Sequence, residues 1–268
     1  MRETGAIVKE GEFSYQVTGE EGNEVIILLH GLMGELSNFG GLVDHFTKTH
    51  NVIFPELPIF EMPLRKLSVM GLVDYVERFV DYKGYKKVHV VGNSLGGHIA
   101  QLFALRRPEL VSSLTLTGSS GLFENAMGNT FPKRGDYEYI KQKVRDVFYD
   151  PVIASKEYVD GLYEMVNNRG KAIRIITMAK SAIRHNLGDK LHGIKCPTLL
   201  VWGREDKVTP LFVGEKFHEL ISNSRLDVVD KCGHAPMMER PVEFNNAFES
   251  FLNSLCKKES ETITVSDS

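Results

Sequence analysis

The chain has 268 residues, of which 42% are hydrophobic and 25% charged, and its formal net charge is -3. This balance is that of an ordinary globular protein, and the scattered lysines and arginines do not favour binding to nucleic acid or to an anionic membrane. No stretch approaches the roughly 20 apolar residues that a membrane span needs. Residues 1–12 lack the apolar segment of a secretory signal, and Cys196, Cys232 and Cys256 show no metal-ligand spacing. These features predict reduced thiols and a cytoplasmic location.

Short apolar runs and helical patterns alternate along the first part of the chain. The alternation at 13–17 predicts a strand, and so do the apolar runs 25–29, 51–54, 88–91 and 114–116. The run 25–29 is apolar throughout, as is typical of a parallel strand that is buried on both faces. Apolar residues at helical spacing predict helices over 69–80 and 95–105. The alternation predicts an α/β fold with a mostly parallel, doubly wound sheet.

The middle of the chain has a different character. Strand patterns are absent from about residue 122 to residue 191, where charged helical patterns such as 137–147 and 156–166 replace them. Strands are predicted again at 198–202 and 225–229, followed by helices at 211–221 and 242–255. We therefore expect a core built from residues 1–121 and 192–256, a helical cap at 122–191, and a disordered polar tail at 257–268.

The strongest motif is Gly92-Asn93-Ser94-Leu95-Gly96-Gly97, which matches the pattern G-x-S-x-G. A buried strand is predicted before it and a helix after it, which is the context that this pattern requires. A serine on such a sharp turn stands above the sheet, and small neighbours let the strand and the helix approach closely. Ser94 is therefore the predicted nucleophile, and the Leu95 N–H at the start of the helix is the first predicted donor to an oxyanion.

A serine hydroxyl needs a base to take its proton, and the base needs an acid to orient it. His234 follows the last predicted strand and is the predicted base, whereas His98 lies on the first turn of the helix after Ser94 and is expected to pack beside the sheet. Asp206 follows the strand 198–202 and is the predicted orienting acid, with Glu205 as its neighbouring alternative. The order Ser94, Asp206, His234 along the chain is the one that α/β-hydrolases use.

The second oxyanion donor is expected in the loop His30-Gly31-Leu32-Met33-Gly34, because this loop follows the strand 25–29. We predict the N–H of Leu32, with that of Met33 as the alternative, and a structural role for His30. The glycines of this loop do not make a phosphate loop, since no lysine follows them in the required place. No cofactor and no metal ion are predicted.

These residues resemble the α/β-hydrolase superfamily of serine hydrolases, which includes bacterial carboxylesterases and the meta-cleavage product hydrolases. The resemblance extends from about Phe13 to Leu255, and it rests on the motifs around Ser94, Asp206 and His234 and on His30-Gly31. It implies an α/β-hydrolase fold with a helical cap and hydrolysis through an acyl-enzyme. A serine at position 94 argues against epoxide hydrolases and haloalkane dehalogenases, which carry an aspartate there.

The predicted activity is hydrolysis of a small or medium carboxylic ester, with the ester as a small-molecule partner and a homo-oligomer left open. The alternative is cleavage of a C–C bond, because Asn93 before the serine resembles many meta-cleavage product hydrolases. Those enzymes commonly carry a tryptophan after the catalytic histidine, where this chain has Ala235, and an arginine in the cap, for which this chain offers Arg169, Arg174 or Arg184. A third possibility of another class is a ligand receptor with slow or no turnover.

Overall fold

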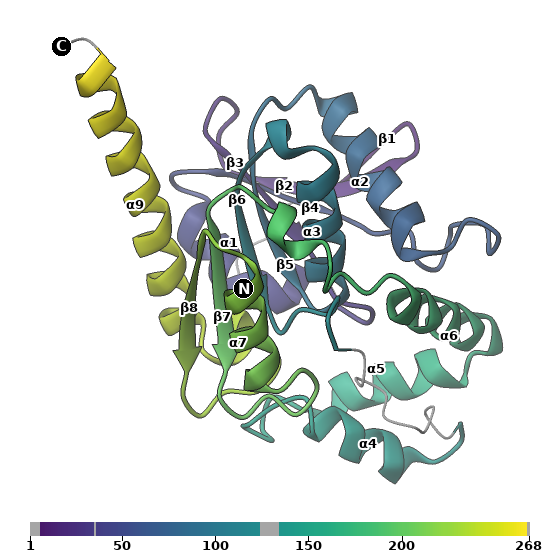
Figure 1. Cartoon of the computed structure of the whole chain (residues 1–268). Helices are drawn as coiled ribbons and strands as arrows, with labels where there is room; N and C mark the ends of the chain where they lie inside the picture. Colours follow the sequence, from purple (N-terminus) through teal and green to yellow (C-terminus); the bar gives the residue numbers. More distant parts are fainter. Residues whose placement is uncertain (1–5, 35, 124–133, 267–268) are drawn as a thin grey trace.

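The structure of the protein is a computed structural model that describes residues 6–34, 36–123 and 134–266 (Figure 1). Within these residues, one sheet of eight strands has the order β1-β2-β4-β3-β5-β6-β7-β8. The antiparallel pairs are β1 with β2 and β2 with β4, and all the other neighbours are parallel. The strands are β1 (Ile7–Glu10), β2 (Phe13–Thr18), β3 (Val25–Leu29), β4 (Asn51–Pro55), β5 (Val88–Asn93), β6 (Val111–Thr117), β7 (Thr198–Gly203) and β8 (Ser224–Val229).

The central strands are buried on both faces, as their continuous apolar sequences predict. Successive side chains of a strand point to opposite faces. In β3, Ile27 and Leu29 therefore join one hydrophobic cluster, and Ile26 and Leu28 join the cluster on the other face. This division separates the helices into two layers, and it confirms the predicted α/β class with a mostly parallel sheet.

The first layer contains α2, α3 and α7, and the second contains α1 and α9. The sequence defines α2 at both ends, because the Ser68 hydroxyl accepts a hydrogen bond from the Gly71 N–H and Gly84 ends the helix in the left-handed conformation at φ 69°. The helices of the core are α1 (Gly40–Phe46), α2 (Val69–Lys83), α3 (Leu95–Arg106), α7 (Leu211–Leu220), α8 (Pro236–Glu239) and α9 (Pro241–Ser266), with short 3-10 helices η1 (Leu36–Phe39), η2 (Pro108–Leu110) and η3 (Leu191–Gly193).

The order of the strands reverses at β3, because β4 lies on one side of β3 and β5 on the other. In an open parallel sheet, the loops at such a reversal diverge and leave a crevice at the carboxyl ends of the strands. The loop after β3 contains residues 30–34, and the turn after β5 contains Ser94. The topology therefore brings the two predicted oxyanion segments and the predicted nucleophile to one edge of the sheet.

The chain between β6 and β7 supplies α4 (Tyr137–Arg145), α5 (Lys156–Asn167) and α6 (Arg169–Arg184), which lie together on one side of the molecule in Figure 1. Residues 124–133 of the predicted cap lie outside the described residues. The apolar sides of α4 and α5 contribute Ile140, Val144 and Val166 to the hydrophobic cluster that also contains α1 and α9. The described part of this insert is thus helical, and it packs against the core.

The structure differs from the sequence-based expectation at several places. The edge strand β1 and the helix α1 were not predicted, and α1 begins with Gly40 and Gly41, which have low helix propensity. Its apolar face explains its formation, because Phe46 packs on Phe248 of α9 with ring centroids 5.0 Å apart. The helix α9 also runs on to Ser266, so residues 257–266 of the predicted disordered tail form its last turns (Figure 1). A helix that has already formed adds each further residue with one hydrogen bond and no nucleation cost.

Candidate active site

Ser94 lies on the sharp turn between β5 and α3, with φ 54° and ψ −119°. A non-glycine residue at positive φ is unfavourable and is kept in place by its surroundings. The Ser94 N–H donates to the Thr117 carbonyl at 3.2 Å, and the Ser94 carbonyl accepts from the N–H groups of His98 and Ser120, each at 3.2 Å. Glycine is required beside it, because a Cβ on Gly96 would lie 2.0 Å from the Leu29 carbonyl oxygen. The strand, the turn and the helix are therefore packed too closely for any larger residue.

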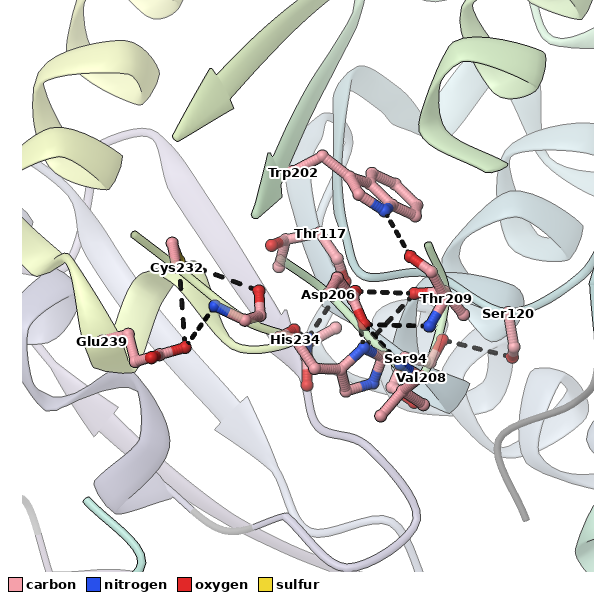
Figure 2. A network of polar contacts seen from close by, with 12 residues as sticks. Ser94, Thr117, Ser120, Trp202, Asp206, Val208, Thr209, Cys232, His234 and Glu239 are labelled. Carbon is pink, nitrogen blue, oxygen red and sulfur yellow. Dashed lines mark hydrogen bonds and ion pairs between the residues drawn. The ribbon is translucent and has the colours of Figure 1, made fainter. Parts of the chain in front are cut away.

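His234 and Asp206 form a buried pair (Figure 2), in which His234 Nδ1 lies 2.9 Å from Asp206 Oδ2. Because a carboxylate only accepts hydrogen bonds, Nδ1 carries the proton of the neutral imidazole and Nε2 keeps its lone pair. The other carboxylate oxygen, Oδ1, accepts from the N–H groups of Val208 at 2.8 Å and Thr209 at 2.9 Å. Thr209 Oγ1 donates to Oδ2 at 2.9 Å. These contacts keep the Asp206 carboxylate in one orientation.

The backbone of His234 is held from two further directions. Its N–H donates to the carbonyl of Val147, in the segment that follows α4, at 2.8 Å. Its carbonyl accepts from the Asn93 side-chain amide at 3.2 Å, and the same amide donates to the Thr117 carbonyl at 3.0 Å. Asn93 therefore links the turn that carries Ser94 to the loop that carries His234.

A cavity of about 440 Å³ opens onto both residues. Its lining includes Ser94, His234 and the loop residues Gly31, Leu32, Met33 and Gly34. The part contributed by the cap is mostly apolar, although it includes Lys143 and Asp146, and Lys207 lines the cavity from the loop after β7. The apolar wall residues of α4, α5 and the segment between them are Ile140, Val144, Val147, Phe148, Leu162 and Val166. The arrangement places a serine and a histidine with a free ring nitrogen beside a chamber that suits an apolar group.

The predicted oxyanion donors come from two different segments, the start of α3 and the loop after β3. Leu95 is the first residue of α3, where N–H groups have no partner within the helix. Leu32 and Met33 both line the cavity, so both remain candidates for the second donor. His30 beside them is buried, and its Nε2 accepts from the Leu57 N–H at 3.3 Å, while its Nδ1 lies 2.7 Å from the Gly31 carbonyl. These contacts tie the start of the loop to the chain after β4.

Comparison with known proteins shows the family. The model of the alpha/beta hydrolase fold matches residues 24–241. The chain belongs to the alpha/beta hydrolase fold family. The crystal structure of MGS-MChE2, an alpha/beta hydrolase enzyme from the metagenome of lagoon sediments of Mar Chica, Morocco, is 42% identical and superposes with a TM-score of 0.77 over 93% of this chain and 98% of that one.

Two curated hydrolases are also similar. The 2-hydroxy-6-oxo-6-phenylhexa-2,4-dienoate hydrolase of Comamonas testosteroni is 29% identical over 262 residues, which are 89% of this chain and 90% of that enzyme. Monoacylglycerol lipase abhd6-B of Xenopus laevis is 25% identical over 269 residues, or 91% of this chain and 80% of the lipase. The predicted α/β-hydrolase fold and the prediction of a serine hydrolase enzyme are thereby confirmed.

His98 and Glu205, which the sequence analysis weighed against His234 and Asp206, make other contacts in the structure. His98 is fully buried in α3, its Nε2 lies 2.8 Å from the His185 carbonyl, and burial lowers its pKa to about 4. Glu205 accepts from the Cys232 N–H at 3.0 Å, whereas Asp206 is the carboxylate that contacts the ring of His234. Among the described residues, no group of histidine, cysteine, aspartate and glutamate side chains is arranged to hold a metal ion. No helix in the described ranges has the length and apolar character to cross a membrane.

The three cap arginines do not line the cavity of this hydrolase. Arg174 points instead at the chain after β4, where its guanidinium donates to the carbonyls of Ile59 and Met62. Sequence reasoning also missed Thr209 and Glu239, which contact the acid and the histidine loop. Thr209 had a local signal, because an aspartate followed by a hydroxyl residue three positions later is a common turn motif. Glu239 had none, since the partners that link it to the cap, Tyr149 and Asp150, lie in a distant part of the chain.

Proposed function

We propose that this protein hydrolyses a small or medium carboxylic ester through an acyl-enzyme, with Ser94, His234 and Asp206 as its catalytic residues. The observation that carries the proposal is the cavity that Ser94 and His234 line together, with His234 oriented by the buried Asp206 carboxylate. The family supports hydrolysis in general. The apolar wall of the chamber supports an ester as the substrate, because it offers room for an acyl or alkyl group.

The proposed reaction has two halves. Ser94 Oγ attacks the ester carbonyl while His234 Nε2 takes the hydroxyl proton, and the carbonyl oxygen becomes an oxyanion. The N–H of Leu95 and that of Leu32, or Met33 in its place, stabilise this charge. His234 then gives its proton to the departing alkoxide. In the second half, water loses a proton to His234 and attacks the acyl-enzyme. His234 then returns this proton to Ser94 Oγ as the acyl–oxygen bond breaks, which releases the carboxylic acid and restores Ser94.

Asp206 contributes by orientation and charge. Its hydrogen bond to Nδ1 keeps the imidazole in the tautomer that can accept the serine proton, and the carboxylate stabilises the imidazolium that then forms. The hydrogen bonds from Val208 and Thr209 keep the carboxylate from turning away. Because these partners are backbone and hydroxyl groups of the same loop, the acid is aligned before any substrate arrives.

C–C bond hydrolysis is the second candidate, and the similarity to the dienoate hydrolase of Comamonas testosteroni favours it. Such a substrate carries a carboxylate, for which a buried arginine is the best partner. The cavity wall of the described residues contains no arginine, and its cationic side chains are those of Lys143 and Lys207. Ala235 also lines the cavity where a tryptophan was expected for this activity. These features favour the ester.

A panel of p-nitrophenyl esters of increasing acyl length, measured beside a meta-cleavage dienoate, tests the choice. We expect the best ester to exceed the dienoate at least about tenfold in kcat/KM, since a single missing ion pair already costs that much. The reverse ranking would show that the protein is a C–C bond hydrolase and not an esterase. A fluorophosphonate probe that fails to modify Ser94, as read by mass spectrometry of the peptides, would instead support a receptor with an inert serine.

A further inference from the structure

Glu239 is a buried carboxylate at the end of α8, with 7% of its surface exposed, and it lies outside the cavity lining. Its Oε1 accepts from the Gly233 N–H at 2.6 Å, in the loop that carries His234. Its Oε2 accepts from the N–H groups of Tyr149 at 2.7 Å and Asp150 at 3.0 Å, in the segment between α4 and α5. One side chain thus joins the histidine loop to the cap segment.

The two segments also contact each other directly. The His234 N–H donates to the Val147 carbonyl at 2.8 Å. A Cβ on Gly233 would lie 2.5 Å from that carbonyl oxygen and 2.9 Å from the Tyr149 nitrogen, so only glycine fits between them. The cap segment therefore touches the loop at the residue before His234 and at His234 itself. Figure 2 shows Glu239 on the side of the loop opposite to Ser94 and Thr209.

A carboxylate can satisfy several donors at once, and hydrogen bonds to an ionised acceptor are shorter and stronger than neutral ones. An amide in the same place would offer one acceptor oxygen and would point an NH₂ group at backbone N–H donors. Either the histidine loop or the cap segment would then lose its partner. Because proton transfer depends on tenths of an ångström, a small displacement of the loop would lower the rate without unfolding the protein.

We infer that Glu239 is a positioning residue that holds His234 in register with Ser94 by fastening its loop to the cap segment 147–150. It touches neither the substrate chamber nor the reacting atoms. The inference rests on the proposed function, in which His234 is the general base. Its effect should therefore appear in kcat and in the hydrogen bond between His234 and Asp206, and hardly in KM.

The test compares Glu239→Gln with Glu77→Gln in the full chain. Glu77 is a matched control, since it is a largely covered carboxylate of α2 that pairs with Arg106 of α3 at 2.8 Å and lies outside the cavity lining. With p-nitrophenyl butyrate we expect Glu239→Gln to lower kcat by about tenfold or more and to change KM less than about twofold. Glu77→Gln should leave both unchanged.

The second measurement follows the His234 Nδ1 proton by NMR, with the resonance assigned through its loss in His234→Ala. We expect this downfield signal to shift or broaden in Glu239→Gln and to stay in place in Glu77→Gln. A reduced kcat with an unchanged signal would overturn the inference, and so would a change in KM alone. If the wild-type protein cleaves no ester, the proposed function fails, but the NMR comparison still decides the role of Glu239.

The third measurement needs no variant and covers the case in which Glu239→Gln does not fold. In the wild-type protein, the backbone N–H groups of Gly233, Tyr149 and Asp150 all donate to the buried carboxylate of Glu239. We expect all three to exchange slowly with deuterium and with similar protection, because they open together. Fast exchange at Tyr149 and Asp150 beside slow exchange at Gly233 would show that the cap segment is not fastened, which overturns the inference.

Discussion

Asp206 Oδ2 and His234 Nδ1 lie 2.9 Å apart, although 28 residues separate them in the chain. The same carboxylate oxygen accepts from Thr209 Oγ1 at 2.9 Å, and that hydroxyl lies 3.3 Å from His234 Nδ1. The acid, the hydroxyl and the imidazole thus form a closed buried triangle at the carboxyl ends of β7 and β8. This geometry leads to the first two predictions.

Replacing either Ser94 or His234 by alanine should lower kcat by about 10³-fold or more, because the proposed nucleophile and its proposed base act as one unit. The double variant should lose little beyond either single one, since removing one partner already disables the other. Stopped-flow or steady-state kinetics with p-nitrophenyl esters measure both effects, and circular dichroism checks that the variants fold. Near-normal turnover by Ser94→Ala would refute the assignment of the nucleophile.

Thr209→Val should lower kcat by about tenfold, since it keeps the shape of the side chain and removes the hydroxyl that donates to Asp206. Thr209→Ser keeps the hydroxyl and is the matched control, so its kcat should stay close to that of the wild type. The ratio of the two rates on one ester is the measurement. Equal losses in both variants would show that packing, and not the hydrogen bond, matters at this position.

Leu162→Trp should select against long acyl chains, because Leu162 lines the chamber from α5 and a larger ring fills it. Cleavage of p-nitrophenyl acetate should persist, while that of the octanoate should fall by about tenfold or more, as one or two displaced methylene groups would produce. Ile173→Trp is the control, since Ile173 is exposed on α6 and outside the cavity lining. A uniform loss on all esters in Leu162→Trp would contradict a role for the chamber in chain length.

His98 should make the protein sensitive to acid. Its pKa is about 4 in the fold, because burial disfavours the charged imidazolium, against an ordinary value of 6.5. Below about pH 6.5 the unfolded chain binds a proton at His98 that the folded protein does not bind, so stability falls as the pH falls toward 4. The full loss is about 3 kcal/mol, from about 1.4 kcal/mol for each pH unit.

The measurement for His98 is the free energy of unfolding in urea between about pH 7 and pH 4, for the wild type and His98→Gln. The difference between the two proteins should move by about 3 kcal/mol in favour of the variant across this range. Subtraction removes the contributions of His50 and His89, whose pKa values burial also lowers. A difference that stays constant with pH would show that His98 is not held neutral by its surroundings.

The central strands and the main helices could be predicted from sequence because each carries its own signal. The run of β3 is apolar at every position, and the pattern around Ser94 combines a buried strand, a glycine-rich turn and a helix. The helix α1 could not, because two glycines open it and its stability comes from tertiary packing of Leu42, Val43 and Phe46, the last against Phe248 of α9. The end of α9 differs for the opposite reason, since a polar segment continues a helix that the core has already started.

By itself, the sequence determined the α/β class, the family motifs and the choice of Ser94, Asp206 and His234 as candidate catalytic residues, because strand periodicity and glycine-rich turns are local properties of the chain. Only the tertiary structure decided which side chains surround them. Residues of α4 and α5 line the chamber, and Arg174 donates to the chain after β4. Glu239 accepts a hydrogen bond from Tyr149, which lies 90 residues before it in the chain. Such contacts depend on how the cap packs on the core, and no spacing along the chain encodes the distance between two segments that meet only after folding.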